Sequence, residues 1–166
     1  MKNILYAVYG SNLCRERFYI YIKGGKFKDK GNNYQGCKDQ TEPEDYGNCF
    51  VPYRLYFAKE SSKWDEKGVA FLTCEKEENK EYHVLVRLWK TTEEQFDCIW
   101  KQEGKSFYHS KLYLGEKEGL EIYTLTGCWL EERNRPTEEY LHWIKNMKHI
   151  EVKSQHPTSE NWQSLL

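Results

Sequence analysis

Two periodicities of hydrophobic residues along the chain predict strands and helices. Six segments have either a short continuous apolar run or apolar residues at every second position. They are residues 3–8, 51–58, 68–74, 82–89, 107–114 and 120–126. Both patterns are typical of strands that bury one or two faces. We therefore predict six strands, of which the first is a short buried one.

The clearest helix lies over residues 93–103. Thr92 followed three residues later by Gln95 matches the capping box that begins many helices. Gly104 stands where a glycine commonly ends a helix. The apolar residues between these two signals have helical spacing. We therefore predict a helix with defined boundaries at both ends.

Two further helices are predicted on less complete signals. Residues 13–22 follow the first strand, and Ser11 or Asn12 is available as the N-cap. Near the other end of the chain, Pro136 suits the first turn of a helix that continues to Lys148. The predicted order is thus strand, helix, loop, several strands, helix, strands and helix.

This order predicts an α+β fold with a mostly antiparallel sheet or a small barrel. Residues 24–48 are rich in Gly, Asn, Asp and Lys, and we expect a long loop there. Loops of this length in compact domains are usually functional or disordered. The length of 166 residues suits one domain, which we place over residues 1–150, followed by a polar tail over 151–166.

The composition is that of a folded protein with many aromatic residues. Lys and Arg number 25 against 26 Asp and Glu, so the basic excess of a nucleic-acid-binding protein is missing. The 26 aromatic residues nearly equal the 29 Leu, Ile, Val and Met residues, which argues against a disordered chain. Since buried phenols need polar partners, a cleft lined with some of the 13 tyrosines is expected.

The six cysteines are scattered along the chain without a CxxC pair. The N-terminal residues lack the apolar stretch of a secretion signal, and no apolar run is long enough to span a bilayer. We therefore expect reduced, mostly buried cysteines in a cytoplasmic protein, whereas a secreted one could form a disulfide framework. Structural zinc usually shows closely spaced ligand pairs, so neither a metal nor another cofactor is expected.

One carboxylate falls on the apolar stripe of the 93–103 helix. Phe96, Ile99 and Trp100 form this stripe, and the next position on it is Glu103. Partial burial and the negative end of the helix dipole both favour the protonated carboxyl group, as a general acid/base near neutrality requires. The alternative, a helix that frays early and leaves Glu103 in solvent, stays open on this pattern alone.

A second candidate is the turn formed by Tyr9, Gly10, Ser11 and Asn12, between the first strand and a helix. Gly10 permits a close approach, and free N–H groups at a helix start favour a carboxylate or an oxyanion. A plain strand-to-helix turn with an Asn cap explains these residues equally well. The turn does not suggest a Ser11 nucleophile, because the GxSxG elbow is missing.

Taken as a set, several motifs resemble the γ-glutamylcyclotransferase-like proteins, a group that includes the AIG2-like proteins of plants and many bacterial members. The motifs follow the family order over roughly residues 5–148. They are YGSN at 9–12, GVAFL at 68–72, Glu103-Gly104 at a helix end, Tyr108, and PTEEYL at 136–141. The resemblance implies a small, mixed, mostly antiparallel β-barrel with flanking helices.

The resemblance also implies a reaction. The α-amine of a small-molecule γ-glutamyl substrate attacks its own γ-carbonyl group, which gives 5-oxoproline and releases an amine. Glu103 is then the catalytic acid/base, the 9–12 loop binds the glutamyl group through backbone amides, and Tyr108 and Tyr140 match aromatic positions near the pocket. Because the nucleophile belongs to the substrate, neither a Ser or Cys nucleophile nor a metal is needed.

Two alternatives to a cyclotransferase stay open. One is a non-catalytic member of the same fold that binds a small acidic metabolite or another protein. The other is a related enzyme that removes a γ-glutamylamine from a biosynthetic intermediate or from a modified side chain. Trp100 stands where many members have Asp, and the 24–50 loop could cover the pocket, so the substrate is open. Nothing in the sequence predicts an oligomeric state.

Overall fold

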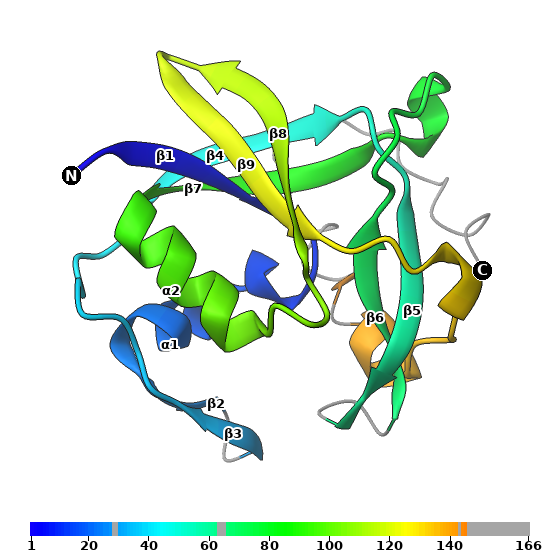
Figure 1. Ribbon diagram of the computed structural model, residues 1–166, viewed down its shortest axis with the longest axis horizontal. Coiled ribbons are helices and arrows are strands. Elements are labelled where there is room, and N and C mark those ends of the chain that lie inside the picture. Colours follow the sequence, from blue (N-terminus) through cyan, green and yellow to red (C-terminus); the bar gives the residue numbers. More distant parts are fainter. Residues whose placement is uncertain (28–29, 63–65, 143, 146–166) are drawn as a thin grey trace.

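Five strands form the main sheet of the computed structural model, in the order β4-β7-β1-β9-β8 (Figure 1). The structure describes residues 1–27, 30–62, 66–142 and 144–145, so the predicted tail lies outside the described residues. The elements are β1 Asn3–Val8, α1 Arg15–Lys23, β2 Gly25–Phe27, β3 Lys30–Tyr34, β4 Glu44–Val51, β5 Leu55–Ser61, β6 Lys67–Leu72, β7 Val84–Thr92, α2 Glu93–Glu103, β8 Ser110–Lys117 and β9 Leu120–Thr126. Residues 138–142 and 144–145 are also helical.

The central strand of the sheet is β1. It pairs antiparallel with β7 and parallel with β9, while β4 and β8 extend the sheet through antiparallel pairs at its two edges. Strands β2 and β3 form a separate antiparallel ribbon, and so do β5 and β6. The predicted α+β fold with a mostly antiparallel sheet is confirmed. The strand pairing of the described residues shows no closed barrel.

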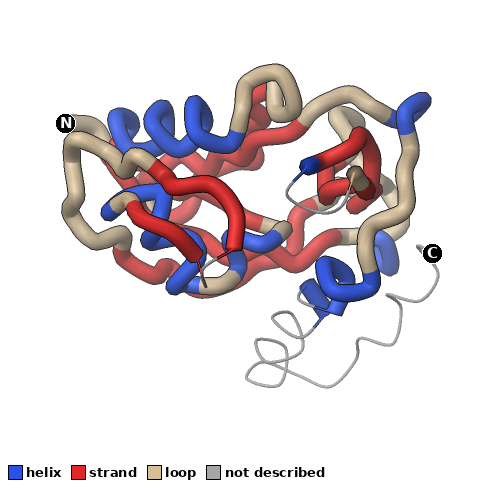
Figure 2. The backbone as a smooth tube through the Cα atoms, turned by 90° about the horizontal axis from the view of Figure 1, so that it is seen from below, coloured by secondary structure: helices blue, strands red, loops and turns tan. Residues whose placement is uncertain are grey.

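Strand β1 is buried on both faces, which explains its continuous apolar run. The residues that face α1 and α2 are Ile4, Tyr6 and Val8, and those that face the β5–β6 ribbon are Leu5, Ala7 and Tyr9. Two cores therefore meet along β1. Both views place the β5–β6 ribbon at the end of the molecule opposite to the N-terminus (Figures 1 and 2).

Helix α2 has the boundaries that the sequence signals at its two ends predict. Thr92 Oγ1 accepts a hydrogen bond from Gln95 N, and Gln95 Oε1 accepts one from Thr92 N, so both bonds of the capping box are present. Gly104 follows the last helical residue with a φ of 95°, in the region that glycine favours. No described helix is long and apolar enough to cross a membrane.

The other two helices begin later than predicted. A short 3₁₀ turn over Ser11–Leu13 comes first, and α1 starts only at Arg15, with Cys14 as an N-cap whose side chain makes no capping hydrogen bond. In the last helix, Thr137 Oγ1 accepts from Tyr140 N, so the helix starts after Thr137 rather than at Pro136. Before α1 the 3₁₀ turn takes residues that were expected to begin the helix, whereas before the last helix Pro136 lies outside it and the Thr137 side chain caps the first turn.

The segment predicted as a loop over 24–48 contains the β2–β3 ribbon and most of β4. These strands were missed because the ribbon is short and polar, and because β4 is an edge strand with mostly exposed or half-buried residues. The strand predicted to begin at Val51 begins at Leu55, since Val51 is the last residue of β4.

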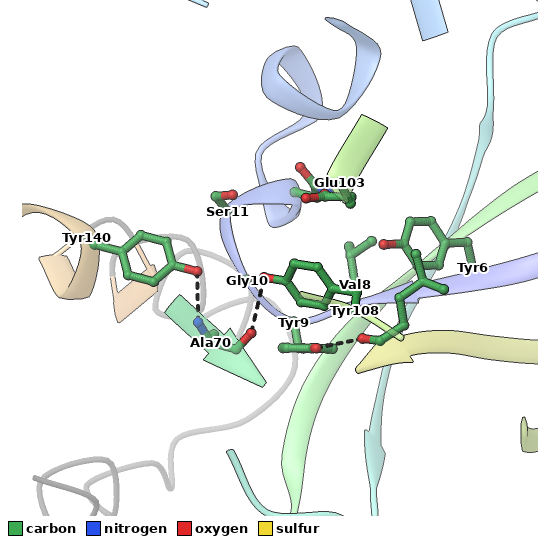
Figure 3. A pocket seen from close by; sticks show the side chains of 11 residues that line it. Tyr6, Val8, Tyr9, Gly10, Ser11, Ala70, Glu103, Tyr108 and Tyr140 are labelled. Atoms are coloured by element: carbon green, nitrogen blue, oxygen red, sulfur yellow. Dashed lines mark hydrogen bonds between the residues drawn. The ribbon is translucent and has the colours of Figure 1, made fainter. Parts of the chain in front are cut away.

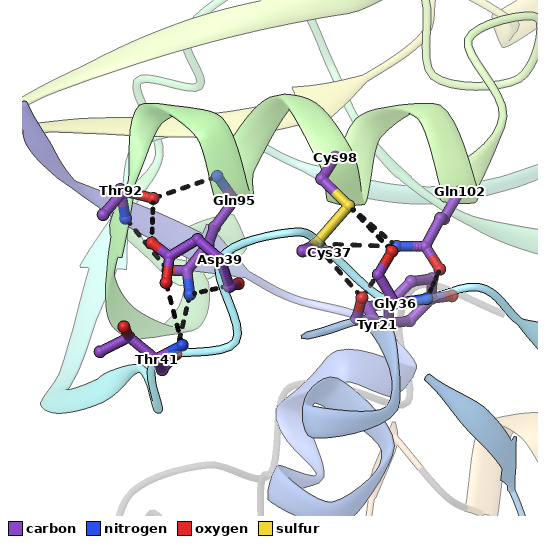
Figure 4. The surroundings of a disulfide bond; sticks show 9 residues. All are labelled: Tyr21, Gly36, Cys37, Asp39, Thr41, Thr92, Gln95, Cys98 and Gln102. Carbon is purple, nitrogen blue, oxygen red and sulfur yellow. Dashed lines mark hydrogen bonds between the residues drawn. A yellow bond between two sulfur atoms is a disulfide. The ribbon is translucent and has the colours of Figure 1, made fainter. Parts of the chain in front are cut away.

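The expectation of six reduced cysteines is wrong for four of them. Cys37 pairs with Cys98 and Cys74 pairs with Cys128, with Cα–Cα distances of 5.8 and 6.6 Å that a disulfide can bridge. Cys14 and Cys49 are free. Each pair joins segments more than fifty residues apart, so no local spacing marked it. The Cys37–Cys98 disulfide ties the chain after β3 to α2 (Figure 4).

The disulfides predict how many cysteines react with an alkylating reagent. Denatured, unreduced protein should take up two equivalents of iodoacetamide, at Cys14 and Cys49, and reduced protein six. Intact mass spectrometry measures both numbers, and peptide mapping identifies the pairs. Uptake of six equivalents before reduction would show that all the cysteines are thiols.

The capping box predicts a stability difference between two neighbouring threonines. Thr92→Val should lower the free energy of unfolding by about 1 kcal/mol, because it removes the cap of α2. Thr91→Val makes the same chemical change one residue earlier. Thr91 Oγ1 is buried without a hydrogen-bond partner among the described residues, so this variant should be as stable as wild type or more so. Urea unfolding measures the free energy of unfolding of both variants. Equal losses in the two would contradict the assignment of Thr92 as the cap of α2.

Candidate active site

A pocket opens at the C-terminal end of β1, where the two cores meet (Figure 3). Its walls come from the end of β1, the following turn, β6, β9, the end of α2 and the last helix. The lining residues are Tyr6, Val8, Tyr9, Gly10, Ser11, Asn12, Ala70, Glu103, Tyr108, Leu125 and Tyr140. The space between these atoms, including the part open to solvent, is about 370 Å³.

All seven residues singled out in the sequence line this one pocket: Glu103, Tyr9, Gly10, Ser11, Asn12, Tyr108 and Tyr140. The four others were not singled out. Tyr6 is the polar one among them, and because residues three apart on a strand point to opposite faces, its distance from Tyr9 gave no signal in the sequence. With four tyrosines in the lining, the expectation of a phenol-lined cleft is confirmed.

The turn after β1 lines the pocket with Gly10, Ser11 and Asn12. Its first internal hydrogen bond runs from Leu13 N to Gly10 O, so the N–H groups of residues 10–12 precede the donors that the turn itself uses. Gly10 also passes close to the last helix, since a Cβ atom there would lie 3.3 Å from Tyr140 Oη. A side chain at position 10 would press on that hydroxyl.

Glu103 is half-buried and points to the turn rather than into solvent. Its Oε1 atom accepts a hydrogen bond from Asn12 Nδ2, and Asn12 is only 6% exposed. The early fraying that would leave Glu103 in solvent is therefore not seen. Asn12 Oδ1 has no hydrogen-bond partner among the described residues, which leaves a buried acceptor beside the carboxylate.

The tyrosines of the pocket are held through their hydroxyl groups. Tyr9 Oη donates to Leu125 O at 2.6 Å, Tyr108 Oη lies 3.4 Å from Ala70 O, and Ala70 N donates to Tyr140 Oη at 3.3 Å. Two of these bonds end on one residue of β6, so that strand aligns both rings (Figure 3).

Burial controls the ionisation of these phenols. It raises the pKa of Tyr6, Tyr9 and Tyr108 well above the ordinary value, and the neighbouring Glu103 carboxylate raises it further. Burial also raises the pKa of Tyr140 to about 12, although the hydrogen bond from Ala70 N opposes this shift. All four hydroxyl groups are therefore neutral near pH 7. In that form they can orient a polar ligand without adding charge.

Trp100 has a defined role at the end of α2. Its indole Nε1 donates to Tyr108 O, and both Phe107 N and Tyr108 N donate to Gly104 O at 3.0 Å. The chain after the helix is thereby folded back, and the Tyr108 ring lines the pocket that Glu103 enters. Among the described residues, no three potential metal ligands of the His, Cys, Asp and Glu types come together.

The shifted pKa of Tyr140 predicts how stability depends on pH. In unfolded chains a tyrosine loses its proton near pH 10, whereas folded Tyr140 keeps it to about 12. The contribution of this pKa shift to the free energy of unfolding is therefore complete below pH 10 and is lost as the pH rises towards 12. In that window the free energy of unfolding of Tyr140→Phe should fall less steeply than that of wild type, by about 1.4 kcal/mol per pH unit. Urea unfolding at several pH values measures both slopes, and equal slopes would contradict the prediction.

Comparison with known proteins gives one match in sequence. Over 130 residues the chain is 33% identical to Histone deacetylase 5 of Arabidopsis thaliana. The match covers 78% of this chain and 19% of that protein, so the chain spans about a fifth of the length of the curated relative it matches. No family model matches the chain.

Solved structures give similarity over nearly the whole chain. A gamma-glutamyl cyclotransferase superposes with a TM-score of 0.63 at 19% identity, over 91% of this chain and 81% of that one. An uncharacterized protein from Homo sapiens superposes with a TM-score of 0.66 at 17% identity, over 98% of this chain and 86% of that one. The resemblance inferred from the motifs is thus confirmed in three dimensions, and this chain has the γ-glutamyl cyclotransferase-like fold.

Proposed function

We propose that this chain is a cyclotransferase-type enzyme that releases 5-oxoproline from a γ-glutamyl amine or peptide. The observation that carries the proposal is the meeting of Glu103 with the 9–12 turn in one pocket, where Asn12 donates a hydrogen bond to the carboxylate. The fold shared with a gamma-glutamyl cyclotransferase supports it. No residue of the protein has to supply a nucleophile, because the α-amine of the substrate does so.

The reaction closes a five-membered ring within the substrate. Glu103 takes a proton from the α-ammonium group, and the free amine then attacks the γ-carbonyl carbon. A new C–N bond forms while the bond from that carbon to the leaving nitrogen breaks, and Glu103 returns the proton to the leaving nitrogen. The ring nitrogen then gives up its second proton, which the released amine takes up, so that the products are the neutral lactam of 5-oxoproline and an ammonium ion. One carboxyl group thus serves as base and then as acid. Holding the amine near the carbonyl carbon contributes a large part of the rate.

The rest of the pocket orients the glutamyl group. The N–H groups of residues 10–12 suit a carboxylate, or the oxyanion that develops on the γ-carbonyl group. Asn12 Oδ1, which has no hydrogen-bond partner among the described residues, is an acceptor that suits the α-ammonium group.

Replacement of Glu103 tests the proposal. Wild-type protein incubated with a panel of γ-glutamyl amines and γ-glutamyl peptides should release 5-oxoproline, which mass spectrometry detects. Glu103→Gln should release it about 10² to 10⁴ times more slowly, because the amide cannot carry the proton. The variant should fold, since the Gln carbonyl oxygen can still accept the hydrogen bond from Asn12.

A matched control comes from the same helix. Glu94→Gln makes the same chemical change at an exposed position of the first turn of α2, and should keep the wild-type rate. Equal rates for wild type and Glu103→Gln would remove Glu103 from the mechanism. Release by neither protein would favour a non-catalytic binding protein. The panel includes γ-glutamyl-modified lysine, so activity on a modified side chain would be seen as well.

A further inference from the structure

Glu103 is the one formally charged side chain in the lining of the pocket, as far as the structure describes the chain. A γ-glutamyl compound brings an α-carboxylate into the same space. Two carboxylates close together repel each other, and partial burial strengthens the repulsion. The α-ammonium group of the compound can pair with Glu103, so it is the α-carboxylate that needs a positive charge from the protein nearby.

Arg17 supplies a positive charge beside the pocket. It is a half-buried residue of the first turn of α1, and its Nε atom donates a hydrogen bond to Ser11 Oγ at 2.8 Å. Its guanidinium also lies 5.7 Å from the ring centre of Phe27 in β2. Contacts on two sides thus hold the group next to the turn that lines the pocket.

No carboxylate among the described residues forms an ion pair with Arg17. Two other partly buried arginines are paired, since Arg87 contacts Asp45 at 2.6 Å and Arg54 contacts Glu77 at 2.8 Å. A guanidinium that is half-buried and lacks such a partner is costly to the fold. This cost is offset when an anion binds beside it.

The electrostatic neighbours of Arg17 belong to the pocket and to its surroundings. Burial lowers the pKa of Arg17, but Tyr21, Tyr34 and Glu103 raise it, and the net shift is upward. The guanidinium in turn lowers the pKa of Tyr140, on the other side of the turn. Arg17 is therefore close enough to influence both sides of the pocket, and its charge does not titrate in the physiological range.

The hydrogen bond from Arg17 also determines what the Ser11 hydroxyl can do. A hydroxyl group has one donor and two acceptor positions, and here one acceptor position is used by the guanidinium. No described residue accepts a hydrogen bond from this hydroxyl, and a charged donor on its oxygen makes it a stronger donor. Ser11 lines the pocket, so this donor is available to a ligand there.

We propose that Arg17, acting with the Ser11 hydroxyl, selects γ-glutamyl compounds whose α-carboxylate is free. Arg17 provides the charge and fixes the hydroxyl, and Ser11 together with the amides of the turn provides the hydrogen bonds. This inference rests on the proposed function, since it names a specificity determinant of the same pocket. A compound whose α-carboxylate is converted into an amide loses the charge attraction and should bind poorly.

The test compares two ligands that differ in this one group, 5-oxoproline and the neutral 5-oxoprolinamide, by isothermal titration calorimetry. Wild-type protein should bind the anion at least about tenfold more tightly than the amide. Arg17→Gln should weaken binding of the anion about tenfold and leave binding of the amide within about twofold. Arg15→Gln, two residues earlier and exposed, should change neither affinity. Arg17→Lys should keep part of the preference, because it keeps the charge and loses the guanidinium geometry.

Two outcomes would overturn the inference. One is equal binding of both ligands by wild type, or binding of neither. The other is an Arg17→Gln variant that binds both ligands more weakly by the same factor, which would give Arg17 a structural role only. If Arg17→Gln does not fold, rising salt concentration must weaken binding of the anion and not of the amide in wild type. Failure of the proposed function is separate, since it means no release of 5-oxoproline from any γ-glutamyl compound, whichever ligand is bound.

Discussion

The hydrogen bond from Asn12 to Glu103 joins two positions 91 residues apart, and the pocket depends on both being fixed. Asn12 follows β1, which has paired strands on both sides. Glu103 is the last residue of α2, whose capping box and following glycine fix its two ends. One residue more or less in α2 would turn that carboxylate by about 100° around the helix, away from the turn. Precise helix boundaries are therefore part of the site.

How far the sequence predicts this arrangement depends on whether the signal is local. The limits of α2 and the inward direction of Glu103 follow from residues within one helix, so they were predictable. The start of α1 was not, because the backbone of the 3₁₀ turn replaces the side-chain cap that Ser11 or Asn12 was expected to provide. The seven candidate residues came largely from family motifs, and the fold brings all of them to one pocket.

Features that depend on tertiary structure could not be predicted from local sequence signals. The pairing of Cys37 with Cys98 spans 61 residues and follows from the docking of the segment after β3 on α2. Arg17 was missed because an arginine in the first turn of a helix is ordinary in sequence. Only the hydrogen bond to Ser11 and the missing carboxylate partner among the described residues set it apart. The polar β2–β3 ribbon was missed because it lacks the alternating apolar pattern of a half-buried strand.

The sequence left open whether the segment over residues 24–50 covers the pocket, and none of its described residues lines it. It packs instead on the two helices that position the charged groups. Gln102, next to the catalytic candidate, accepts from Gly36 N and donates to Tyr21 O at 2.8 Å (Figure 4). Phe27 packs beside the Arg17 guanidinium. A change in this segment would therefore act on the pocket indirectly, through the positions of Glu103 and Arg17, because no described residue of the segment lines the pocket itself.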